Sequence, residues 1–233
     1  MATQATTKVY KLKATSPAVM SSQGLTVRVE ADGFIAVVPD PVTCFAGALY
    51  AQHQRFSLHP SASLVLVDWI TSGRHARGES WSFASFESFN EIVYEDGGSN
   101  ASVVVLSDRV RLTDEPCDPL ASRMGGMTVF GTVVLLGPQL DEMIQSLLQD
   151  GRRKFLAPHQ HPVPAGSPTS TRLNQNVRAA VSRLSPSHPL LSSFSGAIVR
   201  IASRTTESAA DYMRALVEPL EGVVGVRFFH ETR

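Results

Sequence analysis

The chain has 233 residues with 21 basic and 21 acidic side chains, and 43% of its residues are hydrophobic. A chain of this length buries roughly 70% of its unfolded surface, so we expect a globular protein with a substantial core. The balanced charge gives no general attraction for nucleic acid or anionic lipid. No apolar run reaches the roughly 20 residues that cross a bilayer, and two cysteines cannot build a disulfide framework. These features predict a cytoplasmic protein without a nucleic-acid or membrane partner.

The first 137 residues read mainly as strands separated by turns. Residues 25–30 alternate apolar and polar side chains, and Asp32-Gly33 then supplies a turn before the apolar run 34–38, so this stretch predicts a β-hairpin. The Pro39-Asp40-Pro41 segment predicts a rigid bend, because proline lacks the N–H that a strand ladder needs. Further strands are expected at residues 49–58, 63–70, 74–86, 90–95, 101–112 and 127–136.

After Pro138 the apolar period becomes helical. Residues 140–148 predict a helix that stops at Gly151, and residues 158–171 predict an irregular proline-rich loop. A weaker helix is expected at 173–184, a strand at 196–202, and a last helix that begins at Thr205 or Thr206. The fold class is therefore mainly β (α+β), with two or three helices in the C-terminal part. We expect one domain over residues 1–233, with a strand-rich part (1–137) and a helix-containing part (138–233).

The sequence carries no motif of the common cytosolic enzymes, such as a phosphate-binding loop, a GxSxG elbow, HExxH or CxxC. Two alternatives to a non-enzyme stay open. Cys44 with a nearby histidine predicts a cysteine- or metal-dependent hydrolase only weakly, because a buried inert thiol is the commoner state. His159 and His161, two residues apart in the proline-rich loop, are weak candidate ligands for a nickel carrier, since two ligands do not close a metal site.

The most informative segment is residues 63–83, SLVLVDWITSGRHARGESWSF. Asp68 interrupts an apolar strand and lies on the same face as Leu64, Leu66 and Ile70, where a lone carboxylate is costly to bury. If the segment forms a hairpin that turns at Ser72-Gly73, Asp68 lies opposite Arg77; with a longer turn it lies diagonal to Arg74.

On the second strand of that hairpin, Arg77, Glu79, Trp81 and Phe83 share one face. An arginine beside large aromatics suits a partner surface, while the plainer alternative is a structural ion pair that fixes the hairpin. We expect Asp68 and Arg77 to organise the hairpin, with Glu79 and Trp81 presenting or supporting the interaction face.

The same segment resembles the DW-x-(T/S)-x-GR-x-x-RGE-x-W-x-F signature of the urease accessory protein D family. VVPDPVTCFAGALYAQ is similar to that family's PDPVT-x-F element, and TQATTKVYK is similar to its TQ-x-x-TKVY segment; the resemblance is clear from about Thr3 to Gly137. The cysteine after PDPVT is typical of eukaryotic members. The candidate signature or partner-binding residues are Pro39, Asp40, Pro41, Phe45, Tyr50, Asp68, Trp69, Ser72, Gly73, Arg74, Arg77, Gly78, Glu79 and Trp81.

The resemblance implies a non-catalytic protein with an elongated β-sheet body. It implies that the chain bridges apo-urease and the accessory proteins F and G during GTP-dependent nickel insertion, with no tightly bound cofactor and with transient nickel contact. Family members usually have several dozen residues before the TKVY segment, so we also expect the chain to lack early strands and to leave sheet edges exposed.

Overall fold

The structure, a computed structural model, describes residues 6–11, 20–74, 77–95, 102–156, 176–185 and 194–220. Its strands are β1 (Thr7–Val9), β2 (Ser21–Val29), β3 (Phe34–Val37), β4 (Val42–Cys44), β5 (Leu49–Leu58), β6 (Ser63–Thr71), β7 (Ser85–Glu95), β8 (Ser102–Thr113), β9 (Val129–Leu136), β10 (Val177–Arg183) and β11 (Gly196–Ser203). The α-helices are α1 (Leu120–Arg123), α2 (Asp141–Leu156) and α4 (Thr206–Val217), with 3₁₀ turns at η2 (Pro138–Leu140) and η4 (Glu218–Leu220). The fold is mainly β with helices mostly in the C-terminal part, as predicted.

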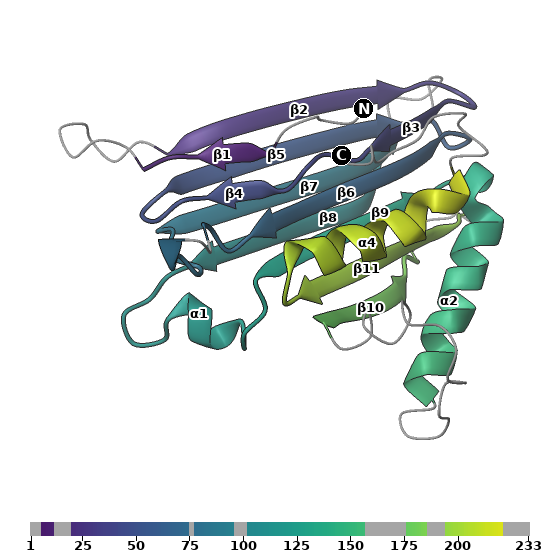
Figure 1. Cartoon of the computed structure of the whole chain (residues 1–233). Coiled ribbons are helices and arrows are strands. Elements are labelled where there is room, and N and C mark those ends of the chain that lie inside the picture. Colours follow the sequence, from purple (N-terminus) through teal and green to yellow (C-terminus); the bar gives the residue numbers. More distant parts are fainter. Residues whose placement is uncertain are drawn as a thin grey trace, which may run out of the picture.

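Within the described residues these strands form two sheets (Figure 1). A seven-stranded mixed sheet has the order β1-β4-β6-β9-β11-β10, and β3 pairs with the first half of β6 beside β4. A four-stranded sheet has the order β2-β5-β7-β8. Strands β2, β5 and β7 run parallel, and β8 returns antiparallel.

The two sheets pack face to face, and their inner faces share one apolar cluster. Phe56 and Leu58 of β5 and Ile92 of β7 meet Leu64 and Leu66 of β6 in that cluster. All five side chains are at most 1% exposed. Because successive side chains of a strand point to opposite faces, the intervening residues of β6 point away from the other sheet.

The outer face of the seven-stranded sheet is covered by helices. Val65 and Val67 of β6 pack in a second cluster with Ile144 of α2 and Met213 and Val217 of α4. Figure 1 shows α4 lying across β9 and β11, with α2 beside them. A strand buried on both faces reads as a continuous apolar run, which explains the SLVLV sequence of β6.

A third apolar cluster closes one end of the molecule. It contains Tyr50, Ile70, Trp81, Phe83 and Phe86, all at most 3% exposed. Trp81 and Phe83 pack edge to face with ring centroids 5.9 Å apart, and Phe86 lies 6.3 Å from Phe83. This cluster anchors the chain where it passes from β6 in one sheet to β7 in the other.

Two predicted hairpins are wrong for the same reason. Asp32 does form a turn, with a φ of 58°, but β2 before it pairs with β5 and β3 after it pairs with β6 in the other sheet. The chain also leaves β6 for the other sheet, so the described residues between Arg74 and Ser85 form no strand and β7 begins only at Ser85. Alternation and turn residues indicate strands, but they do not indicate which sheet each strand joins.

Two predictions in the C-terminal part are also wrong. The expected helix at 173–184 is described only from residue 176, and there it is the strand β10, whose residues pair with β11 from Val177↔Ser203 to Arg183↔Ala197. Pairing along an existing strand outweighs a weak helical period. Helix α2 continues through Gly151 to Leu156, because an interior glycine costs a helix only about 1 kcal/mol. The strand at 196–202 and the helix after Thr205 are confirmed as β11 and α4.

Candidate functional site

The segment that carries the sequence resemblance begins in β6 with Asp68 and Trp69 and continues in a loop between the two sheets. We call residues 72–84 the signature loop; it connects the end of β6 to the start of β7. Its first residue, Ser72, is buried, and its backbone N–H donates to the carbonyl of Thr128 (2.8 Å). The backbone N–H of Trp81 donates back to the Ser72 carbonyl (2.7 Å), which brings the two ends of the loop together.

Asp68 does not pair with arginine, so the predicted hairpin ion pair is wrong. Its side chain points between the sheets, as the alternation of β6 predicted, and there it meets the four-stranded sheet. One carboxylate oxygen accepts from Gln52 Nε2 (2.6 Å), and the other accepts from Ser88 Oγ (2.5 Å) and Asn90 Nδ2 (2.8 Å). Among the described residues no guanidinium contacts this carboxylate. Three neutral donors stabilise the carboxylate instead.

Asp68 belongs to a polar layer that crosses the space between the sheets. On the seven-stranded sheet, Asp68, Thr132 and Arg200 lie side by side in register across β6, β9 and β11. On the other sheet, Asn90 of β7 is paired directly with Asp108 of β8.

Arg200 closes the polar layer, because its Nη1 and Nη2 donate to the two carboxylate oxygens of Asp108 (2.9 and 2.5 Å). Nη1 also donates to Thr132 Oγ1 (2.6 Å). The layer contains Gln52, Gln54, Asp68, Ser88, Asn90, Asp108, Thr132 and Arg200, and separates the inter-sheet apolar cluster from the cluster at the end of the molecule.

A small pocket opens from this layer toward the β1–β4 and β2 edges. It encloses about 70 Å³, enough for a few water molecules, and its walls include Asp40, Gln52, Gln54, Asp68 and Trp69. The indole N–H of Trp69 donates to the carbonyl of Pro39 (2.8 Å) and so fixes the Pro39-Asp40-Pro41 bend against β6. The rest of its wall is largely apolar, with Leu25, Val37 and Val42 facing the amides and the two carboxylates.

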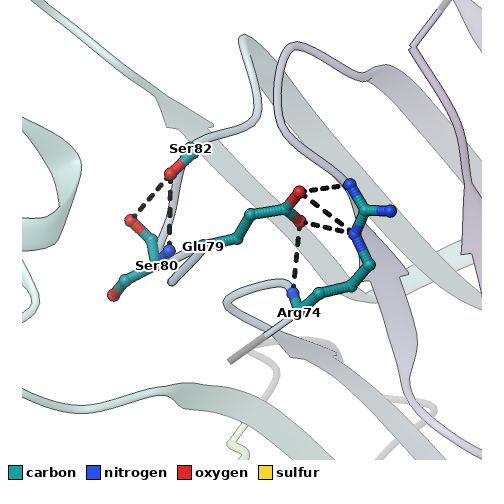
Figure 2. Close-up of polar contacts among 4 residues, drawn as sticks. All are labelled: Arg74, Glu79, Ser80 and Ser82. Atoms are coloured by element: carbon teal, nitrogen blue, oxygen red, sulfur yellow. Dashed lines mark hydrogen bonds and ion pairs between the residues drawn. The ribbon is translucent and has the colours of Figure 1, made fainter. Parts of the chain in front are cut away.

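The centre of the signature loop is clamped by Arg74 and Glu79 (Figure 2). Arg74 Nε donates to both carboxylate oxygens of Glu79 (3.0 Å each), Nη2 donates to Oε1, and the Arg74 backbone N–H donates to Oε2 (3.3 Å). These bonds lower the pKa of Glu79 and raise that of Arg74, mainly through the side-chain hydrogen bond. Beside the clamp, Ser82 Oγ donates to the Ser80 carbonyl (3.3 Å).

Glycine and tryptophan fix the backbone of the loop. Gly73 has a φ of 124°, which is strained for any residue with a side chain, and a Cβ there would crowd Glu79 Cβ at 3.2 Å. Gly78 has a φ of 74°. Trp81 has a φ of 54°, which is uncommon outside glycine, and its indole N–H donates to the Met127 carbonyl (2.7 Å). Trp81 is 1% exposed, so it supports the loop from below and presents no side chain at the surface.

The PDPVT-x-F element lies directly against the loop. The guanidinium carbon of Arg74 lies 4.1 Å from the centre of the Phe45 ring. The same ring packs edge to face with Tyr10, with the two ring centres 4.8 Å apart. Tyr50, five residues on, is buried and donates its hydroxyl hydrogen bond to Gln23 Oε1 (2.9 Å). Burial, followed by the charges of Cys44 and Asp68, raises the pKa of Tyr50 to about 12.

The remaining predicted residues are placed as follows. Pro41 is buried, while Arg77 and Gly78 are exposed in the signature loop. His159 and His161 lie outside the described residues, so their candidate role stays a prediction. The part of the chain that the structure describes contains no group of three or more His, Cys, Asp or Glu side chains able to hold a metal ion.

Cys44 is an inert core thiol in this structure. It is 1% exposed, and burial raises its pKa to about 12, so the thiolate that a nucleophile requires is absent at neutral pH. The hydrolase alternative therefore loses its candidate nucleophile. Among the described helices none is long and apolar enough to span a membrane.

Sequence reasoning missed the polar layer and the exposed Tyr10. The sequence does contain a signal for the layer. Gln52 and Gln54 lie on the same face of β5 as the buried Tyr50 and Phe56. Ser88 and Asn90 likewise lie on the buried face of β7. Polar side chains at core positions on two neighbouring strands indicate a buried network. No pattern in the sequence alone indicates that Tyr10 meets Phe45.

Comparison with known proteins defines the class of this chain. The family model described as "UreD urease accessory protein" matches residues 1–228. The chain is 36% identical over 226 residues to "Urease accessory protein D" of Oryza sativa subsp. indica, covering 97% of this chain and 71% of the relative. It is 34% identical to "Urease accessory protein D" of Arabidopsis thaliana over 230 residues (96% and 73%).

A bacterial relative is equally similar. "Urease accessory protein UreD" of Anaeromyxobacter sp. (strain Fw109-5) is 34% identical over 232 residues, which cover 100% of this chain and 67% of the relative. The chain belongs to the UreD urease accessory protein family. Plant and bacterial members match at nearly the same identity, so these comparisons do not distinguish a eukaryotic-type member.

Proposed function

We propose that this protein is a non-catalytic scaffold of urease maturation in the cytoplasm. In this role it binds apo-urease and the accessory proteins F and G, and it holds them together while the GTP cycle of protein G drives nickel insertion. The observation that carries the proposal is the match of residues 1–228 to the UreD family. A scaffold of this kind needs rigid surfaces and no reactive side chain.

Two features of the structure support this role. The signature loop is held by the Arg74–Glu79 clamp and by the buried Trp81, which gives a partner a preformed surface and lowers the entropy cost of binding. The polar layer joins the two sheets through the hydrogen bonds of Asp68 and Arg200, which holds the body of the scaffold together, and transient nickel contact is proposed from the family alone. Neither feature calls for a tightly bound cofactor.

Reconstitution of urease activation tests the proposal. Apo-urease, accessory proteins F and G, nickel, bicarbonate and GTP are combined with or without this protein, and urease activity and its nickel content are measured. We expect activation to require this protein and to fail when GTP is replaced by a non-hydrolysable analogue. Equal activation with and without the chain would contradict the proposal.

The carrier alternative is tested separately by equilibrium dialysis of the isolated chain with nickel at neutral pH. The scaffold role predicts weak or unsaturable binding. Tight saturable binding that is lost in the His159→Ala/His161→Ala variant would favour a stand-alone nickel carrier. Wild type and variant are compared at matched far-UV circular dichroism, so that a folding defect is not read as loss of a ligand.

A further inference from the structure

One exposed tyrosine lies beside the signature loop, near cationic residues of the loop and of its own segment. Tyr10 is 65% exposed and rests on Phe45, which also carries the guanidinium of Arg74. The stem of Lys11 lies over Gly47, since a Cβ added there would be 3.0 Å from Lys11 Cδ. We call the exposed residues Tyr10, Lys11 and Arg77, together with the half-buried Arg74, the Tyr10 patch.

Arg77 joins this patch through the backbone of the loop. Its N–H donates to the carbonyl of Arg74 (2.9 Å), which places the two residues in one turn, and the Arg77 side chain is exposed. No ion-pair partner of Arg77 or Lys11 is found in the described parts of the chain. Both positive charges therefore face solvent.

Glu79, the carboxylate beside the patch, is already paired with Arg74. The Glu79 side chain is 12% exposed, and both of its carboxylate oxygens accept from Arg74. The negative charge of Glu79 therefore neutralises the positive charge of Arg74. It does not neutralise the charges of Lys11 and Arg77. A surface that carries uncompensated cations is complementary to one that carries carboxylates, which favours encounter with such a partner.

Backbone hydrogen bonds hold the chain beneath the patch. The N–H groups of Arg77 and Glu79 both donate to the Arg74 carbonyl (2.9 and 3.2 Å), and the Phe45 N–H donates to the Val9 carbonyl (2.9 Å), next to Tyr10. Tyrosine and arginine are the side chains most often found as anchors at the centre of protein interfaces. Their fixed backbone lowers the entropy cost of ordering them on binding.

We propose that the Tyr10 patch is a docking site for a carboxylate-rich surface of a protein partner in the urease assembly. This inference rests on the proposed scaffold function and names the contact that the signature loop makes. The residues named here have two roles: Gly73, Glu79 and Trp81 shape the signature loop, and Tyr10, Lys11 and Arg77 contact the partner.

Binding measurements with charge-reversal variants test the inference. Accessory protein F, accessory protein G and apo-urease are immobilised separately, and the full-length chain is passed over each at low and high salt. The test variants are Lys11→Glu, Arg77→Glu and Tyr10→Ala, with Arg77→Gln as a milder change. The matched control is Arg178→Glu, because Arg178 is an exposed arginine on the edge strand β10 at the opposite edge of the sheet.

We expect at least one of the three surfaces to bind the wild type and to lose about tenfold in affinity with Lys11→Glu or Arg77→Glu, mainly through slower association. The loss should shrink at high salt, and Arg178→Glu should bind as the wild type does. If the wild type binds and the patch variants bind equally well, the inference is wrong while the scaffold function stands. If the wild type binds none of the three proteins, the scaffold function itself fails.

Discussion

Glu79 is the residue on which the shape of the signature loop depends most. It accepts from the guanidinium and from the backbone N–H of Arg74, and Gly73 has no Cβ where that carboxylate passes. The clamp is local, since it joins residues five positions apart. The sequence contains both partners, but strand alternation placed them on opposite faces of a hairpin that does not form.

The Arg74–Glu79 clamp predicts a pH dependence. The pKa of Glu79 is lowered in the folded state by the hydrogen bond from Arg74, so its contribution to stability is complete above the ordinary glutamate pKa of about 4.3. That contribution is lost as the pH falls through the lowered folded-state pKa. We expect the urea midpoint of the wild type to exceed that of Glu79→Gln near neutral pH, and the difference to shrink in acid. A difference that stays constant over this range would contradict the clamp.

Asp68 accepts hydrogen bonds from three side chains of the other sheet. Replacement by alanine leaves donors of Gln52, Ser88 and Asn90 without their acceptor in the polar layer. We expect Asp68→Ala to lower the free energy of unfolding by about 2–3 kcal/mol, measured by urea denaturation. Asp211→Ala, which removes an exposed carboxylate on α4, is the control and should change it by less than about 0.5 kcal/mol. An equal effect of the two changes would contradict the network.

At the scale of elements, local signals succeeded where one segment decides its own structure. Helix α4 is an example, because Thr205 has an extended conformation and its hydroxyl accepts from the Ser208 N–H (3.1 Å) before the apolar face begins. Strand β10 is the opposite case: its own residues suggested a helix, and only the free edge of β11 makes it a strand.

The cap of α4 gives a prediction for this element. Thr205→Ala removes the acceptor for the Ser208 N–H and should lower the free energy of unfolding by about 1 kcal/mol, measured by urea denaturation. Thr205→Ser keeps the hydroxyl and should retain most of the stability. Thr206→Ala, one residue further on and also exposed, is the matched control and should have little effect. Equal stability of Thr205→Ala and Thr206→Ala would show that the cap contributes nothing.

At the scale of the whole molecule, the strand-rich and helix-containing parts share their cores. Ile198 of the helix-containing part joins the inter-sheet cluster of Phe56 and Leu66, and Val65 of the strand-rich part packs in the same cluster as the helices. The Arg200–Asp108 ion pair then links β11 to the four-stranded sheet. Neither part buries its apolar face without the other.

This shared core predicts one cooperative unfolding transition, as the single-domain interpretation requires. The two tryptophans report different regions, since Trp69 lies in the helix-side cluster and Trp81 in the cluster at the end of the molecule. Single-tryptophan variants that keep one or the other should unfold in urea at the same midpoint as the circular dichroism signal. Two separated transitions, or a fragment of residues 1–137 that folds alone, would contradict this.

The sequence by itself determined the class of fold, most strand positions, the face on which Asp68 lies and the family, because alternation, turn residues and motifs are local properties of the chain. Only the tertiary structure decided which strands are neighbours, and with that the partners of Asp68, the burial of Trp81 and the meeting of Tyr10 with Phe45 and Arg74. Strand pairing joins residues far apart in sequence, and its choice depends on how two whole sheets cover each other's apolar faces, which no single segment encodes.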